Sequence, residues 1–220
     1  MSAQFLNGKV VAESVLFQVA EKVEQLKPSG VTPGLGTILV GDDGPSMSYV
    51  NKKIETCKDV GIASFHKHIP VNGTQADLMA AVESFNNNPE VDAYIIQHPV
   101  PQGFDFNEAL MAMAPEKDAD GFHPLNVGKL SISQKNDENL LIPCTPYGCL
   151  LMLKELNIDL VGKNAVVIGR SNIVGKPMAQ LLLKESCTVT IVHSKTLNIK
   201  NICRNADILV AAIGKPEFVN

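Results

Sequence analysis

The sequence predicts an α/β fold in which a mostly parallel sheet is wrapped by helices. Short apolar runs recur along the chain, and continuous apolar runs are typical of strands that are covered on both faces. Segments whose apolar residues have helical spacing lie between these runs. Because parallel strands need crossover connections, this alternation indicates strands that are linked through helices rather than through hairpins.

The predicted elements follow one another in a regular order. Strands are expected at residues 37–41, 93–97, 165–169, 188–192 and 207–214. Helices are expected at residues 9–26, 46–60, 75–85, 105–113, 145–156 and 175–185. The stretch from Lys117 to Pro146 is non-periodic and includes a polar run at residues 133–139. We therefore predict two domains, residues 1–145 and residues 146–220.

The composition favours a globular protein that acts on small molecules. Hydrophobic residues make up 45% of the 220 residues, which is enough to build a buried core. The net charge is −4 and no basic run is seen, so nucleic acid is not an expected partner. The first residues lack a secretory pattern, and no apolar run approaches membrane-spanning length. We expect a cytoplasmic protein with no membrane partner.

The cysteines and histidines suggest neither a disulfide framework nor a metal site. The 5 cysteines are odd in number and never form Cys-x-x-Cys, so we interpret them as reduced, mostly buried thiols. The 5 histidines are scattered along the chain without the spacing of metal ligands.

The segment from Gly169 to Gly175 has the pattern of a loop that holds the pyrophosphate of a dinucleotide. An apolar strand ends at Gly169 and an apolar helix begins at Gly175. Glycines at these positions let the backbone approach a phosphate, and the start of a helix offers free N–H groups and a partial positive charge. The pattern is Gly-x-Ser-x-x-x-Gly rather than Gly-x-Gly-x-x-Gly, so an ordinary tight turn is the alternative interpretation.

The end of the next strand predicts which dinucleotide is bound. NAD sites usually have an Asp or Glu there, which accepts hydrogen bonds from the ribose 2′-hydroxyl. Here the strand is followed by His193-Ser194-Lys195-Thr196, with no carboxylate. Ser194, Lys195 and Arg170 suit a 2′-phosphate, so we predict NADP. The alternative is that Lys195 and Arg170 are solvated surface cations.

Tyr49 and Lys53 are four residues apart in a predicted helix, which places an aromatic ring beside an ammonium on one face. A lysine in this position is a candidate acid/base group. An exposed Tyr/Lys pair is the alternative when this helix is considered alone.

Further motifs change that balance. They are Gln97-His98-Pro99-Val100-Pro101 at a strand end, the segment Pro115–Pro124 with its Asp-Ala-Asp-Gly core, and Pro143-Cys144-Thr145-Pro146-x-Gly148. Together with Tyr49-x-x-x-Lys53 and Gly169–Pro177, they resemble the bifunctional methylenetetrahydrofolate dehydrogenase/methenyltetrahydrofolate cyclohydrolase (FolD) family. The resemblance runs from about Gly8 to the last residue.

The resemblance implies two reactions in one-carbon metabolism. 5,10-Methylenetetrahydrofolate passes a hydride to NADP, and water then opens the methenyl product to 10-formyltetrahydrofolate. It further implies a folate-binding catalytic domain followed by a Rossmann-like NADP-binding domain, and a homodimer.

The resemblance also assigns roles to residues of this chain. Lys53 is the expected acid/base group and Gln97 its hydrogen-bonding partner, while Tyr49 stacks on the folate and Asp120 binds the polar edge of the pterin. A turn residue before Gly121 is the alternative for Asp120. The expected cofactor-binding residues are Gly169, Arg170, Ser171, Ile173, Val174, Gly175, Pro177, His193, Ser194, Lys195 and Thr196.

The chain departs from the family pattern at its end. The family continues beyond the segment 207–220 with further strands of the cofactor sheet and a glycine-rich loop. We therefore expect an incomplete cofactor sheet, and an NADP affinity that is weakened as a result.

A monofunctional relative of the bifunctional enzyme is the nearest alternative. Two alternatives of other classes also remain open from the sequence. A catalytically silent NADP-binding protein has no need of Tyr49, Lys53, Gln97 and Asp120 together. An unrelated NADP dehydrogenase for hydroxy acids or amino acids needs a cationic or imidazole group to hold a carboxylate, and none is well placed.

Overall fold

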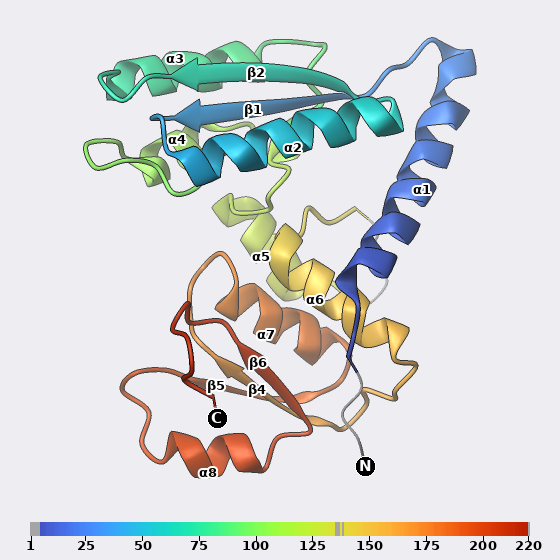
Figure 1. Cartoon of the computed structure of the whole chain (residues 1–220), viewed down its shortest axis with the longest axis vertical. Coiled ribbons are helices and arrows are strands. Elements are labelled where there is room, and N and C mark those ends of the chain that lie inside the picture. Colours follow the sequence, from blue (N-terminus) through green and yellow to red (C-terminus); the bar gives the residue numbers. More distant parts are fainter. Residues whose placement is uncertain (1–4, 135–136, 138, 220) are drawn as a thin grey trace. The chain divides into compact units, whose positions relative to one another are not determined.

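A computed structural model describes residues 5–134, 137 and 139–219 of the chain. The chain divides into two compact units, Met1–His123 and Pro124–Asn220, which we call unit 1 and unit 2 (Figure 1). This division comes earlier than the predicted boundary near residue 145. The difference arises because helix α5 (Pro124–Ile132), within the stretch that we took as non-periodic, packs against a helix of unit 2.

Unit 1 is a parallel sheet with strand order β2-β1-β3, and α2 and α3 pack on it. Its elements are α1 (Gly8–Leu26), η1 (Lys27–Ser29), β1 (Gly34–Val40), α2 (Gly44–Val60), β2 (Ala63–Ile69), α3 (Gln75–Asn86), β3 (Ala93–Ile96), α4 (Phe106–Ala112) and η2 (Pro115–Lys117). The chain leaves β1 toward β2 and then returns to pair β3 on the other side of β1. This reversal in strand order creates a topological switch point between β1 and β3. Proteins with an α/β fold bind ligands at the carboxyl ends of the strands that flank such a point.

Short polar signals start and end the helices of unit 1. The Asp43 carboxylate caps α2 by accepting the backbone N–H of Ser46 at 3.0 Å, which holds the pKa of Asp43 below its usual value. Gly61 ends the same helix with φ +82°, in the left-handed region. Thr74 and Asp77 form a capping box at the start of α3. The apolar faces of these elements bury a core that includes Ile38, Val40, Leu78, Val82, Phe85, Val91, Tyr94 and Ile96.

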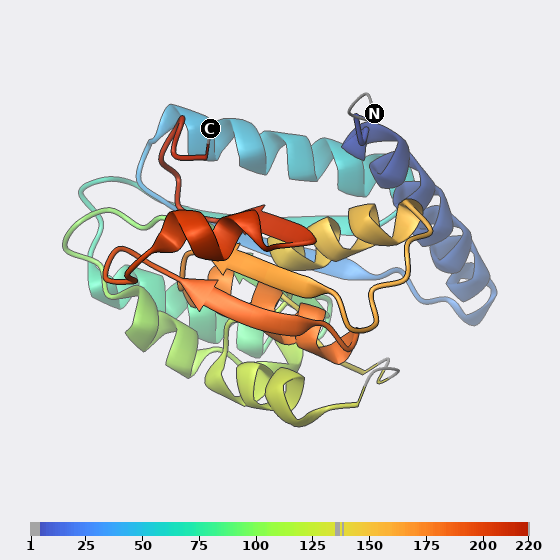
Figure 2. The same cartoon turned by 90° about the horizontal axis from the view of Figure 1, so that it is seen from below.

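Unit 2 repeats the same plan, with strand order β5-β4-β6 and all pairs parallel (Figure 2). Its elements are α5, α6 (Cys144–Glu155), β4 (Asn164–Ile168), α7 (Gly175–Lys184), β5 (Thr188–Val192), α8 (Ile199–Arg204) and β6 (Ile208–Ala211). In Figure 1, α7 and α8 lie on opposite faces of the sheet. The main core lies on the α7 face and includes Leu150, Ala165, Val167, Met178, Leu181, Leu182 and Ile208.

The two sheets also share details of their hydrogen bonding. Asp92 accepts the Gly34 N–H at 2.7 Å, and Asp207 likewise accepts the Asn164 N–H at 2.8 Å. Each Asp precedes the third strand of its sheet and ties it to the first strand. In each unit the first strand also ends at a glycine with positive φ, Gly41 at +80° and Gly169 at +122°.

The parallel α/β architecture was predicted, but one strand and two α-helices in the described part of the chain were missed. Four of the seven residues of strand β2 are exposed and polar, so it lacks the continuous apolar run that identified the other strands. Helix α5 contains Gly128, and α8 has only 6 residues, so both give weak periodicity. Residues 135, 136 and 138 of the predicted polar run lie outside the described residues. No helix in the described part of the chain is long and apolar enough to cross a membrane.

The thiol prediction was only partly right. None of the five cysteines, all of which the structure describes, forms a disulfide, but only Cys57 and Cys187 are buried, and Cys144 is exposed.

Candidate active site

The carboxyl end of β3 brings together two of the predicted residues of unit 1. Gln97 directly follows β3, and its backbone N–H continues the ladder by donating to the Ile38 carbonyl at 2.8 Å. Lys53 lies in the middle of α2, and its Nζ is 2.9 Å from Gln97 Oε1. Both side chains are partly buried. A helix that starts at the switch point thus meets the residue at which the third strand ends.

The amide of Gln97 is held in one orientation. Its Nε2 donates to the carbonyl oxygen of His98 at 3.0 Å, while Oε1 accepts from Lys53. A flipped amide would place an NH₂ group against an ammonium and an oxygen against a carbonyl, and both bonds would be lost. The geometry therefore directs an acceptor at Lys53 and holds its amine in place.

Tyr49 lies one turn before Lys53 on α2, as predicted. The Lys53 Nζ is 5.8 Å from the centroid of the Tyr49 ring, within the range of a cation–π contact. The Tyr49 side chain is 66% exposed, so most of the ring is available for contact with a planar molecule.

Asp120 is held in a tight turn that is anchored on β3. Ala119 N–H donates to the Tyr94 carbonyl at 3.2 Å, three residues before Gln97 along the chain. Gly121 N–H donates to the Asp118 carbonyl at 3.2 Å, and His123 N–H donates to Asp118 Oδ2 at 2.8 Å. Asp120 is itself partly buried. The sequence had singled out Asp120 but not the buried Asp118 that closes its turn.

The glycines of the predicted cofactor loop are required by close packing in unit 2. A Cβ on Gly175 would lie 2.4 Å from the carbonyl oxygen of Gly169, and a Cβ on Gly169 would lie 2.3 Å from that of Ala212. Both glycines are buried. The end of β4, the start of α7 and the end of β6 therefore meet with no room for a side chain.

Ser171 organises the loop between these glycines. Its hydroxyl accepts the backbone N–H groups of Val174 at 3.1 Å and Gly175 at 3.2 Å, and its carbonyl accepts that of Lys176 at 3.0 Å. Pro177 has no N–H to offer. Within the described residues, no hydrogen bond engages the N–H groups of residues 171–173. The donors that remain for a phosphate therefore belong to the loop rather than to the first turn of α7.

The other predicted cofactor residues occupy different environments. Arg170, Ser194 and Lys195 are exposed, Ile173, Val174, His193 and Thr196 are partly buried, and Pro177 is buried within α7.

A compact turn follows β5. His193 N–H donates to Thr196 Oγ1 at 2.9 Å, and Lys195 N–H donates to His193 Nδ1 at 3.2 Å. These bonds fix the turn that carries Ser194 and Lys195. The turn and Arg170 both follow carboxyl ends of strands in the same sheet, and they contain no carboxylate.

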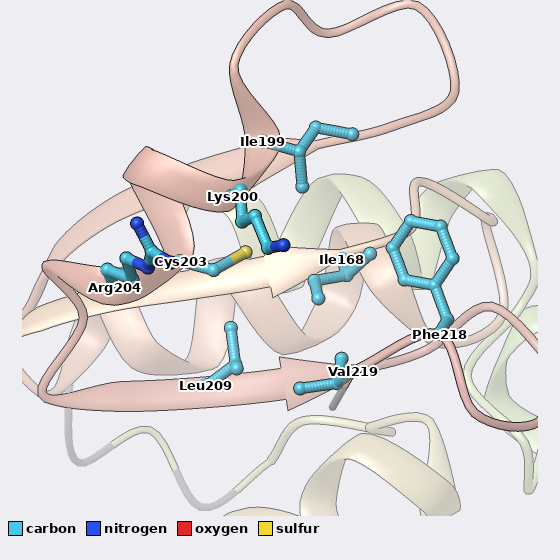
Figure 3. A pocket seen from close by; sticks show the side chains of 8 residues that line it. All are labelled: Ile168, Ile199, Lys200, Cys203, Arg204, Leu209, Phe218 and Val219. Carbon is cyan, nitrogen blue, oxygen red and sulfur yellow. The ribbon is translucent and has the colours of Figure 1, made fainter.

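A pocket of about 420 Å³ in unit 2 lies apart from these residues. Figure 3 shows side chains of α8, β4 and β6 converging with Phe218 and Val219 around it. It contains none of the predicted cofactor residues, although Ile168 on its wall directly precedes Gly169.

Comparisons with known proteins match both units of the chain. The model of the tetrahydrofolate dehydrogenase/cyclohydrolase catalytic domain matches residues 6–120, and that of the NAD(P)-binding domain of the same enzymes matches residues 143–220. The bifunctional protein FolD of Syntrophotalea carbinolica is 56% identical over 223 residues, which cover 100% of this chain and 76% of that protein.

Solved structures give the same result. The bifunctional FolD enzyme of Campylobacter jejuni superposes with a TM-score of 0.91 at 38% identity, covering 97% of this chain and 74% of that one. The FolD of Trypanosoma brucei, complexed with NADP cofactor and inhibitor, gives 0.92 at 36% identity over 98% of this chain and 74% of that one. The chain therefore belongs to the tetrahydrofolate dehydrogenase/cyclohydrolase family.

Proposed function

We propose that this protein oxidises 5,10-methylenetetrahydrofolate with NADP and hydrolyses the methenyl product to 10-formyltetrahydrofolate. The observation that carries the proposal is the Lys53–Gln97 hydrogen bond of 2.9 Å at the switch point of unit 1, in a chain of this family. A protein that only bound NADP would have no need of the Lys53–Gln97 pair.

Hydrolysis is the step for which Lys53 is suited. The methenyl carbon is electrophilic, so the reaction needs a positioned water and proton transfer more than a covalent nucleophile. The water oxygen bonds to the methenyl carbon and the bond from that carbon to N5 breaks, which leaves the formyl group on N10. Lys53 is proposed to accept a proton from the water at Nζ and to return it to N5 as the bond to the carbon breaks. The second proton of the water is released, because the methenyl substrate is a cation and the formyl product is neutral at these atoms. Gln97 holds the amine in place through Oε1 while leaving it free to exchange protons.

Recognition of the folate is assigned to Tyr49 and Asp120. The exposed Tyr49 ring offers a flat surface for stacking. The Asp120 carboxylate suits the adjacent N–H donors on the polar edge of a pterin, because each of its oxygens can accept a hydrogen bond.

Unit 2 is assigned to hold NADP, which when bound would supply the acceptor for the hydride of the methylene carbon. The close packing of Gly169 and Gly175 and the free N–H groups of residues 171–173 fit a pyrophosphate. Arg170, Ser194 and Lys195 fit a 2′-phosphate and supply two positive charges. The remaining predicted residues, Ile173, Val174, Pro177, His193 and Thr196, shape the loop and the turn.

Replacing Lys53 with Met tests the assignment. We expect cyclohydrolase activity to fall by about 100-fold or more, because a general acid/base group typically contributes that much. Methenyl absorbance is followed as it appears, which reports the dehydrogenase, and as it decays, which reports the hydrolysis. Lys52→Met is the matched control, because the Lys52 side chain is 73% exposed and pairs only loosely with Glu55 at 3.7 Å. Unchanged decay in Lys53→Met would remove Lys53 from the mechanism.

The assembly and location of the protein are proposed on narrower grounds. A homodimer is proposed from the family resemblance, and light scattering during gel filtration tests it against a monomer. A cytoplasmic location is supported by the five free cysteines, because reducing compartments keep thiols unpaired.

A further inference from the structure

Asp118 is a buried carboxylate that the proposed chemistry does not use. Only 1% of its surface is exposed, whereas Ala119 and Asp120 beside it are partly buried. Its backbone pairs with Tyr94 in the sheet, and its Oδ2 accepts the His123 N–H at 2.8 Å. A carboxylate that is buried this deeply needs such donors, since a charge without partners is strongly disfavoured inside a protein.

The bonds of Asp118 enclose Asp120. The Asp118 carbonyl accepts Gly121 N–H at 3.2 Å and its side chain accepts His123 N–H, so one residue closes the turn twice. Gly121 has φ +65°, which lets the chain reverse directly after Asp120. The direction in which Asp120 leaves the backbone is therefore set by a turn built on Asp118.

The approach to this turn is anchored independently. Lys117 Nζ donates to the carbonyls of Phe85 at 3.0 Å and Asn88 at 2.8 Å, near the end of α3. Asn86 Oδ1 accepts the Ala114 N–H at 2.9 Å. Ala114 and Lys117 are thus fastened at the end of α3, and Asp118 and Ala119 are fastened to β3. Asp120 comes next, inside the turn that Asp118 closes.

A second buried group supports the same arrangement. Burial, and then the negative charge of Asp118, raise the pKa of the Tyr94 phenol. The phenol therefore stays protonated and donates to Asn86 Oδ1 at 2.7 Å. Tyr94 of β3 thus fixes Asn86 Oδ1, the atom that accepts the Ala114 N–H. Gln97 directly follows the same strand.

We propose that Asp118 is a positioning residue for folate binding, which acts by holding Asp120 in the orientation that recognises the pterin. The proposal rests on the role proposed for Asp120. It predicts that Asp118 has no effect of its own on the folate once Asp120 has lost its carboxylate.

A double-mutant cycle tests this dependence. The KM for 5,10-methenyltetrahydrofolate is measured in the hydrolysis reaction, which needs no NADP and so leaves unit 2 out. Asp118→Asn is expected to raise this KM about tenfold with kcat changed less than about twofold, because a charge-assisted bond to the turn is replaced by a weaker neutral one. Asp120→Asn is expected to raise KM at least as much. The double variant is expected to match Asp120→Asn alone.

The controls separate positioning from folding. Asp92→Asn removes a carboxylate that accepts a backbone N–H in the same sheet, 2.7 Å from Gly34 N, but lies at the start of β3 away from the turn. Its KM should stay unchanged. The melting temperature of every variant is recorded. If Asp118→Asn does not fold, Lys117→Met replaces it, because this change removes the fastening to α3 and is expected to raise KM in the same cycle.

The outcomes are distinct. An equal rise in KM from Asp118→Asn with and without the Asp120 carboxylate would overturn the positioning role, as would a KM unchanged by Asp118→Asn. If Asp120→Asn itself leaves KM unchanged, the proposed folate contact of Asp120 fails, and the positioning role falls with it. The wider catalytic proposal is judged separately by Lys53→Met.

Discussion

Gly175→Ala is expected to disable the cofactor unit while sparing hydrolysis. The added Cβ would lie 2.4 Å from Gly169 O, 2.6 Å from Gly169 C and 2.9 Å from Arg170 N, all backbone atoms. Ordinary contacts begin near 3.4 Å, so the start of α7 must retreat by about 1 Å. Such a shift breaks the hydrogen bonds from Val174 and Gly175 to the Ser171 hydroxyl, which are already 3.1 and 3.2 Å long.

The magnitude follows from these contacts. Overpacking of this kind typically destabilises a protein by about 1–3 kcal/mol, and we expect unit 2 to lose about 2 kcal/mol in urea unfolding. NADPH affinity, followed by fluorescence titration, should fall by about tenfold or more because the loop donors move with Ser171.

The matched control is Gly128→Ala in α5 of the same unit. A Cβ on Gly128 has nothing within 4 Å, so this change is expected to stabilise the helix by about 0.5–1 kcal/mol. Hydrolysis of methenyltetrahydrofolate should persist in both variants. If Gly175→Ala binds NADPH as tightly as the unchanged protein and unfolds at the same urea concentration, the close packing is not what builds the loop.

Two further predictions concern charge. Replacing Arg170 or Lys195 with alanine should raise the KM for NADP by about tenfold and leave the KM for NAD nearly unchanged, because only NADP carries the 2′-phosphate. Both values are measured in dehydrogenase assays, and equal effects on the two cofactors would show that these residues do not select NADP. Desolvation of the ring against its neighbours, and then the charge of His68, lower the pKa of His66, although the residue as a whole is exposed. The folded state thus disfavours the protonated ring, so the His66 contribution lowers the stability of the protein as pH falls through 6.5. In thermal melts from pH 8 to pH 5, the melting temperature of His66→Gln should therefore fall less than that of the unchanged protein. Melting temperatures that fall equally in both proteins would contradict this prediction.

The sequence was sufficient where residues must be buried on both sides. The strand at 165–169 was found because β4 is the central strand of its sheet, and four of its five residues are buried apolar side chains. Strand β5 lies at the edge of the same sheet and is mostly exposed, and it was found from its β-branched residues. Strand β2 was missed because it lies at the edge of its sheet, where exposed His66, Lys67 and His68 are tolerated. Pattern reasoning detects runs of β-branched and aliphatic residues, which β5 has and β2 lacks.

The sequence predicted which residues belong to the candidate site, but not the contacts that hold them in place. Tyr49, Lys53 and Gln97 were found from motif order, but their contacts depend on how α2 crosses the sheet. Asp118 shares its motif with Asp120, and only burial distinguishes the carboxylate that faces inward. The Ser171 hydroxyl was expected to serve the cofactor, yet it also satisfies the start of α7, which no spacing rule reveals.

The repeated plan of the two sheets has a consequence for how ligands are sorted. Both units place a helix start beside a strand-end glycine, which is a geometry that attracts anions. In unit 1 this position carries Asp42 and Asp43, and Asp43 already occupies the Ser46 N–H. In unit 2 the equivalent loop carries Arg170 and leaves backbone donors open. A phosphate is therefore repelled at the unit 1 loop and attracted at the unit 2 loop. The same architecture thus favours chemically different ligands at its two sites.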